Sequence, residues 1–180
     1  IIFQKKTRFG KNFDETICKL LSRNHIYNTK IRREGRILSE ILGDYKVGIA
    51  TAMIKRKFFN GFDNRYHVIG DFEFIIRIAA KEPIGYVDQI LAFYRVHGNN
   101  ESFIHRKLQI RELSMWFNET KKNKDISALK NFKNLEYKIK YLRAMDDIGD
   151  KNYKYPINFI FNLPLSFWKL KLRLLIILLS

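Results

Sequence analysis

The sequence has little cysteine and proline, and it has no long uninterrupted apolar run. Its single cysteine, Cys18, cannot form a disulfide within the chain and favours a reducing compartment. No stretch reaches the roughly 18 apolar residues that a membrane-spanning helix needs. Residue 1 is Ile, neither an initiator Met nor the start of a signal peptide. We therefore expect neither a disulfide-rich secreted protein nor an integral membrane protein, but the later part of a longer chain.

Acidic residues are few relative to basic ones, and they are unevenly placed. The 180 residues carry 34 Lys and Arg against 18 Asp and Glu, a net charge of +16. A hydrophobic content of 46% and an aromatic content of 14% argue against a disordered basic tail. The net charge is +9 over residues 1–60, −1 over 61–120 and +8 over 121–180. Because the acids gather in the middle third, we expect carboxylate chemistry there.

The apolar pattern predicts an α/β chain. The run 45–54, rich in β-branched residues, is typical of a buried strand, and residues 84–95 are expected to form one or two strands. Between them, Asp71 caps a helix over 72–81 or lies in its first turn. The opening residues 1–10 show no clear period. The other expected helices are one that Asn12 or Asp14 caps and that ends at Arg23, and those over 37–42, 103–120 and 126–145.

Three short motifs follow one another in the middle of the chain. They are Gly61-Phe62-Asp63 after the apolar run, Gly70-Asp71 at the start of a helix that contains Arg77, and Tyr94-Arg95-Val96-His97 before a loop with Asn99, Asn100 and Ser102. In this order and spacing, the motifs resemble the C-terminal half of glycosyltransferase family 2. The resemblance covers about Val47 to Ser102. It implies an α/β fold, a partial GT-A (nucleotide-diphospho-sugar transferase, Rossmann-like) fold that is followed by an α-helical extension.

The resemblance also implies a division of the chain and an activity. Residues 1–102 would be the C-terminal portion of a GT-A domain, 103–150 a helical extension, and 151–180 a basic apolar tail. Members of this family transfer a sugar from a nucleotide-diphosphate sugar to an acceptor hydroxyl. We accordingly expect an inverting hexosyltransferase that acts on a glycan or lipid-linked acceptor in surface polysaccharide or cell-envelope biosynthesis.

Asp71 is the candidate catalytic residue. Direct displacement at an anomeric carbon needs a carboxylate that takes the proton of the acceptor hydroxyl, and a carboxylate near a helix N-terminus stays ionised at neutral pH. The resemblance implies that Asp71 is this general base, although many relatives have Glu where this chain has Gly70. An ordinary N-cap Asp is the alternative. Glu73 is expected to be a helix-surface or first-turn charge, with Arg77 as its structural partner four residues on.

Five residues are candidate substrate ligands. The resemblance implies that Arg95 and His97 lie at the metal and diphosphate of the donor. A neutral His97 can ligate a divalent metal and a protonated one can meet a diphosphate, while a solvated loop histidine is the alternative. Thr51 and Asp63 are expected to line the approach of the acceptor. Asn99, in the same loop as His97, is expected to bind substrate.

The metal motif of the family is missing from this sequence. Relatives hold Mg²⁺ or Mn²⁺ through an Asp-x-Asp motif in their N-terminal half. No Asp-x-Asp occurs here, and the adjacent Asp146 and Asp147 come too late in the chain. We therefore expect a divalent metal that an absent N-terminal half mainly holds, with His97 as a local ligand. We also expect that this chain alone transfers no sugar.

The basic flanks leave the partner open. Near the end of the chain Lys169, Lys171 and Arg173 alternate with apolar residues, as in a segment that lies on an anionic membrane. A helix packed on the domain is the alternative. Nucleic acid is the weaker expectation, because no nucleic-acid-binding module is recognisable. We expect a cytoplasmic protein at the inner face of the plasma membrane. A non-catalytic basic module for membrane or nucleic acid is the rival to an enzyme.

Overall fold

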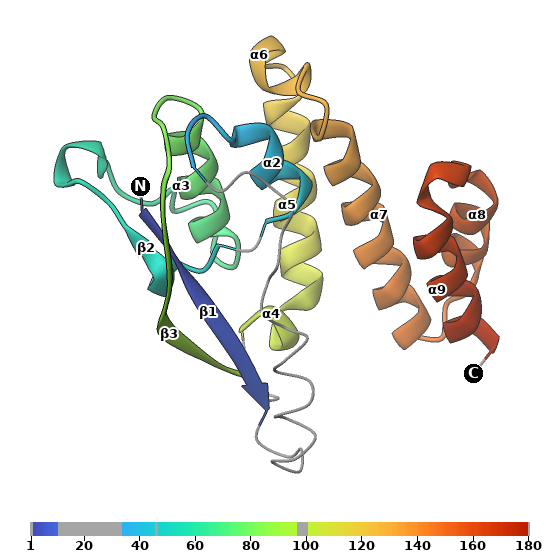
Figure 1. Ribbon diagram of the computed structural model, residues 1–180. Helices are drawn as coiled ribbons and strands as arrows, with labels where there is room; N and C mark the ends of the chain where they lie inside the picture. The colour runs from blue at the N-terminus through green and yellow to red at the C-terminus, as the bar shows by residue number, and fades with distance from the viewer. Residues whose placement is uncertain (1, 11–33, 46, 97–100, 180) are drawn as a thin grey trace.

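A three-stranded sheet stands at one side of the molecule. The computed structural model describes residues 2–10, 34–45, 47–96 and 101–179 (Figure 1). Its strands are β1 (Ile2–Gly10), β2 (Ala52–Met53) and β3 (Gly85–Val96). The strand order is β2-β1-β3; β1 runs parallel to β3 and antiparallel to β2. The pairing of β1 with β3 extends from Ile2 opposite Gly85 to Gly10 opposite Val96, with two irregularities near Lys5.

Helices make up most of the rest of the described chain. The α-helices are α2 (Leu38–Gly43), α3 (Gly70–Ala79), α4 (Glu101–Ile104), α5 (Arg106–Thr120), α6 (Lys124–Ser127), α7 (Phe132–Gly149), α8 (Lys154–Asn162) and α9 (Trp168–Leu179). Three short 3-10 helices are η1 (Ile49–Thr51), η2 (Arg56–Phe58) and η3 (Leu165–Phe167). Among the helices described, none has both the length and the apolarity that crossing a membrane requires.

The larger hydrophobic core surrounds α3. This helix is apolar on nearly every side, which is the pattern of a helix buried on all faces. It lies between the sheet and α5, with α2 beside it (Figure 1). Phe72 packs edge-on against Trp116 of α5 at 4.9 Å between ring centroids, and Phe117 stacks on Phe132 of α7 at 4.6 Å. Burying each large apolar side chain contributes about 1.5–3 kcal/mol, so this core fixes where the start of α3 lies.

A second, smaller core joins the end of the chain to α7. Its buried members are Ala144, Phe159, Ile160, Leu163 and Leu174. The long helix α7 serves both cores, since Leu135 and Ile139 belong to the larger one and Ala144 to the smaller. The helical hairpin of α8 and α9 packs on the side of α7 that faces away from α5 (Figure 1). Part of the basic apolar tail is therefore packed on the helical extension.

Several predicted elements are confirmed. The helix expected over 37–42 is α2, that over 72–81 is α3, and 84–95 forms the single strand β3. The helices expected over 103–120 and 126–145 correspond mainly to α5 and α7. The helix expected to end at Arg23 lies outside the described residues.

The predicted buried strand over 45–54 is wrong, and β1 was not predicted. The Thr51 hydroxyl and backbone N–H both donate to the carbonyl of Gly48, at 2.7 and 2.8 Å, and this tight 3-10 turn interrupts the run. Only Ala52–Met53 pairs as a strand, with Ile2 and Phe3 of β1. Strand β1 depends on pairing with β3, more than 80 residues later in the sequence, so no local period reveals it.

Tyr45 provides a test of the larger core. Its hydroxyl is buried without a hydrogen-bond partner among the described residues, while its ring packs edge-on against Phe72 at 4.9 Å. Burial, and then the negative charge of Asp71, raise the pKa of Tyr45, so its hydroxyl stays protonated. We predict that Tyr45→Phe leaves the free energy of unfolding unchanged or raises it by up to about 1 kcal/mol, because an unpartnered buried hydroxyl costs desolvation.

Tyr66→Phe is the matched control. The Tyr66 hydroxyl donates to Glu119 at 3.1 Å, so its removal should lower the free energy of unfolding by about 0.5–1.5 kcal/mol. Urea denaturation followed by tryptophan fluorescence measures both variants, because Trp116 is buried in this core. A greater loss of stability for Tyr45→Phe than for Tyr66→Phe would contradict the account.

Candidate functional site

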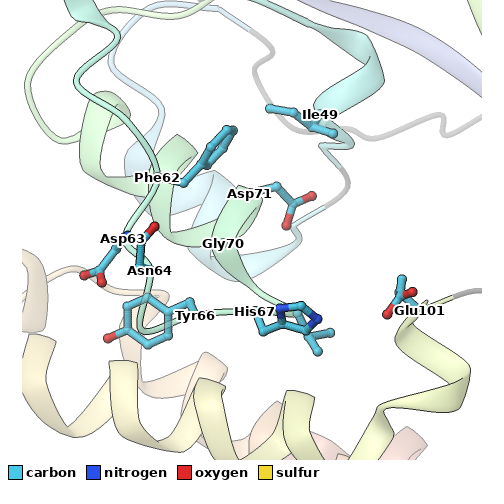
Figure 2. Close-up of a pocket in the computed structure, with 10 residues that line it drawn as sticks. Ile49, Phe62, Asp63, Asn64, Tyr66, His67, Gly70, Asp71 and Glu101 are labelled. Atoms are coloured by element: carbon cyan, nitrogen blue, oxygen red, sulfur yellow. The ribbon is translucent and has the colours of Figure 1, made fainter.

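An open pocket of about 660 Å³ lies at the start of α3 (Figure 2). Three parts of the sequence form it: η1, the stretch 62–71 that leads into α3 and includes its first turn, and the start of α4. Its lining residues are Ile49, Phe62, Asp63, Asn64, Tyr66, His67, Val68, Gly70, Asp71 and Glu101. The fold therefore brings two of the sequence motifs, Gly61-Phe62-Asp63 and Gly70-Asp71, to one cavity.

Asp71 lies in the first turn of α3 and points into this pocket. Figure 2 shows its carboxylate directed toward the space between Ile49 and Glu101. Its Oδ1 accepts the backbone N–H of Phe72 at 2.7 Å. The N-cap residue is Ile69 and it makes no side-chain cap, so Asp71 is not the N-cap that the alternative interpretation supposed. The unpaired N–H groups of a helix N-terminus favour a negative charge at this position.

Glu112 of α5 fixes the loop that leads into α3. Its carboxylate accepts three consecutive backbone N–H groups, from His67 at 2.8 Å, Val68 at 2.9 Å and Ile69 at 3.0 Å. Glu112 is only 4% exposed. A buried carboxylate is tolerated where it is this fully hydrogen-bonded. Glu112 thus holds the N-cap residue Ile69 and the two residues before it, and so helps to set where α3 and Asp71 begin.

Sequence reasoning missed Glu112, although a signal was present. Glu112 is four residues before Trp116 and next to Leu113, so it lies on the apolar face of the amphipathic α5 helix. A carboxylate on such a face must find buried donors, because burying an unpaired charge is costly. The need for buried donors could have identified Glu112 as a structural residue, but it could not have identified the N–H groups that it binds.

Asp63 lines the pocket, and a surface network of charges holds it. Arg65 donates to both oxygens of Asp63, the shortest contact being 2.8 Å, and its Nη1 donates to Glu119 of α5 at 2.9 Å. Hydrogen bonds from Arg65 lower the pKa of Asp63. In Figure 2 the Asp63 carboxylate turns away from Asp71. Asp63 therefore ties the loop to α5 at the rim of the pocket.

Arg77 ties the Gly61 turn to α3. Its Nε donates to Glu73 at 2.8 Å, its Nη2 donates to the Gly61 carbonyl at 2.8 Å, and its Nη1 donates to Asn60 Oδ1. Gly61 has φ of +85°, a left-handed conformation that suits glycine. The expected pairing of Arg77 with Glu73 is confirmed, and Arg77 has a structural role. Glu73 lies in the first turn as expected, but it is buried and not a surface charge.

The remaining predicted ligands are placed as follows. Thr51 is buried, its hydroxyl donates to Gly48, and it is not among the pocket-lining residues. Arg95 stands opposite Phe9 near the end of β3. His97 and Asn99 lie outside the described residues. Glu101, which comes shortly after them in the sequence, does line the pocket.

Two histidines lie close to Glu101. His105 Nε2 is 3.4 Å from a Glu101 oxygen, and the rings of His67 and His105 are 6.3 Å apart between centroids. Even so, no group of three or more His, Cys, Asp or Glu in the described part of the chain is arranged to hold a metal ion. These residues by themselves do not fit a divalent metal, so we assign no step of the chemistry to one.

The Glu112 contact predicts a specific loss of stability. In Glu112→Gln an amide NH₂ replaces one acceptor oxygen and faces backbone N–H donors, so we expect the free energy of unfolding to fall by about 1–3 kcal/mol. Glu136→Gln is the control, because Glu136 pairs with Lys140 on the exposed side of α7 and its loss should cost less than about 1 kcal/mol. Urea denaturation of both variants is the measurement. Equal stabilities would show that the loop leading into α3 does not depend on Glu112.

Comparison with known proteins adds no relative from which to transfer a role. No family model matches the chain, and neither a curated protein nor a solved structure matches it. The function therefore has to be argued from the pocket and its residues.

Proposed function

We infer that the chain is the acceptor-side part of an inverting glycosyltransferase, with a partial GT-A fold, in which Asp71 is the general base. The observation that carries this proposal is the convergence of Gly61-Phe62-Asp63 and Gly70-Asp71 on one open pocket into which Asp71 points (Figure 2). The resemblance to glycosyltransferase family 2 depends on these motifs in their order and spacing. A volume near 660 Å³ is within the usual range for small-molecule pockets.

The proposed reaction is a single displacement. The acceptor hydroxyl oxygen attacks the anomeric carbon of the donor sugar, the bond from that carbon to the nucleoside diphosphate breaks, and the hydroxyl proton passes to an Oδ atom of Asp71. The diphosphate leaves with the electron pair of the broken bond. Attack from the side opposite the leaving group inverts the anomeric configuration, and one carboxylate is enough to accept the proton.

The surroundings of Asp71 suit a base that is charged before the reaction. The N-terminus of α3 favours the ionised carboxylate, and the Glu112 contacts hold the preceding loop rigid. A general base must lie within hydrogen-bond reach of the proton that it accepts. The wide opening of the pocket leaves room for an acceptor on one side and a donor on the other, which we propose that Arg95, His97 and Asn99 help to bind.

The remaining parts of the proposal concern the donor, the metal and the location. The donor is a nucleotide sugar. A divalent metal, Mg²⁺ or Mn²⁺, would be held by His97 and by an N-terminal half outside this chain, not by the described pocket residues, and would neutralise the charge of the diphosphate. The acceptor is a glycan or lipid-linked glycan of the cell envelope, and the reaction takes place in the cytoplasm at the inner face of the plasma membrane. The cationic first and last thirds of the chain support a negatively charged substrate or surface.

A non-catalytic membrane-binding module is the second candidate. One observation favours it: apolar residues on α9, including Trp168, Leu172 and Ile176, are exposed beside Lys and Arg residues. The two candidates differ in what they require of Asp71. An enzyme needs its carboxylate, whereas a binding module does not.

Asp71→Asn tests the proposed base. The natural protein that contains this chain should be assayed for sugar transfer to envelope lipid extracts, with UDP-, GDP- and dTDP-sugars in the presence of Mg²⁺ or Mn²⁺. Because Asn keeps the acceptor for the Phe72 N–H but cannot take a proton, we expect kcat to fall about 10²–10⁴-fold with the melting temperature unchanged. Asp125→Asn, in the short exposed helix α6, is the control and should keep full activity. A rate for Asp71→Asn above about a tenth of wild type would exclude Asp71 as the base.

A further inference from the structure

Helix α9 has two apolar faces, and the described residues cover one of them. Leu174 is fully buried in the smaller core, and Leu170 and Leu178 pack against that core. On the other side, Trp168, Leu172, Leu175 and Ile176 are exposed. They follow the spacing i, i+4, i+7 and i+8, so they form one stripe along the helix. Because one apolar side of α9 is covered by the smaller core, we expect the other apolar side to contact a second apolar environment.

Two more large apolar residues of the same hairpin are exposed. Phe161, near the end of α8, is 78% exposed, and Leu165 in η3 is 82% exposed. We call these six residues the hairpin face: Phe161, Leu165, Trp168, Leu172, Leu175 and Ile176. Single exposed apolar residues are ordinary, whereas a set of large ones on one short hairpin marks an interaction surface.

Basic residues border this stripe on both sides. On one border, Lys169 lies three residues before Leu172, and Arg173 lies three residues before Ile176. Lys171 lies on the other border, three residues after Trp168 and four before Leu175. The Lys169 ammonium is 5.6 Å from the centre of the Trp168 ring.

The charge of this region has one sign only. Residues 151–180 contain five Lys and Arg and no Asp or Glu. If two copies of the chain met through the hairpin face, these cations would face one another without any acid from the same region to pair with. An apolar surface with a purely cationic border is complementary instead to a lipid bilayer that carries anionic headgroups.

We propose that the hairpin face is an interfacial membrane-binding surface for anionic lipid. Helix α9 lies in the plane of the membrane, Trp168, Leu172, Leu175 and Ile176 enter the boundary between headgroups and acyl chains, and the bordering Lys and Arg side chains meet lipid phosphates. Phe161 and Leu165 enter at the turn of the hairpin. This binding does not rest on the proposed transfer reaction, and Asp71→Asn should leave it unchanged.

Co-sedimentation with vesicles tests the proposal. The chain is mixed with vesicles of phosphatidylcholine alone, or of about three parts phosphatidylcholine to one part phosphatidylserine, and the bound fraction is measured. We expect binding to the phosphatidylserine vesicles to be at least tenfold tighter. Leu172→Gln with Ile176→Gln, and separately Lys169→Gln with Arg173→Gln, should each weaken it at least tenfold. All four positions are exposed, so the variants should fold.

Two control variants carry matched changes elsewhere. Ile104→Gln replaces an equally exposed apolar residue on α4, and Lys121→Gln with Lys122→Gln removes two exposed charges after α5. Both should bind vesicles like the wild type. Trp168 gives a local signal, because the other tryptophan, Trp116, is already buried. Its fluorescence should shift to the blue on phosphatidylserine vesicles, and Trp168→Phe should abolish the shift.

Three results would overturn the proposal. The first is wild-type binding that is absent or equal on both kinds of vesicle. The second is a dimer in sedimentation velocity that Leu172→Gln with Ile176→Gln dissociates, which would make the hairpin face a contact between copies. The third is binding to single-stranded RNA that depends on Lys169 and Arg173 and that prevents vesicle binding.

Discussion

The Glu112 carboxylate, which accepts the backbone N–H groups of residues 67–69, is the contact on which the candidate site depends. The start of α3 has no side-chain cap of its own, and orphan donors at a buried helix end are costly unless another group satisfies them. Glu112 of α5 accepts the N–H group of the N-cap residue Ile69 and those of the two residues before it. The helical extension is thus part of the site, because it decides how the first turn of α3 and Asp71 face the pocket. Arg77 and the Asp63-Arg65-Glu119 network fix the other wall in the same way, by joining the Gly61 loop to α3 and α5.

The distribution of charge gives the molecule two regions with different roles. The near-neutral middle third contains the buried and half-buried carboxylates that shape the pocket, each with named donors. Every charged residue among the last 30 is a Lys or Arg. Several of these border the apolar face of a hairpin that packs on α7, away from the sheet (Figure 1). A net charge of +16 therefore does not describe one uniform basic surface. In our account a chemical site and a membrane-binding site are joined by the long helix α7, which contributes to both cores.

The sequence predicted the helices better than the sheet, for a physical reason. Helices α2, α5 and α7 could be predicted because each buries a face that recurs every three to four residues. Strand β1 depends on a partner far along the chain, and the run 45–54 is broken by the Thr51 hydroxyl bond to Gly48. Asp71, Asp63 and Arg77 were found from their motifs, and all three lie in or beside the pocket. The place of Glu112 on the apolar face of α5 could have marked it, but its backbone N–H partners carry no signature in the sequence. The exposure of Trp168 and Ile176 likewise followed only from the packing of α9 against the smaller core through Leu174.

The stereochemistry of transfer tests the central claim most directly. Proton NMR of the first product formed by the natural protein reports the anomeric configuration before any later rearrangement. If Asp71 acts as a base and not as a nucleophile, the product has the anomeric configuration opposite to that of the donor. Retention of the donor configuration would require a covalent glycosyl intermediate or attack from the same face, and it would contradict the role that we assign to Asp71.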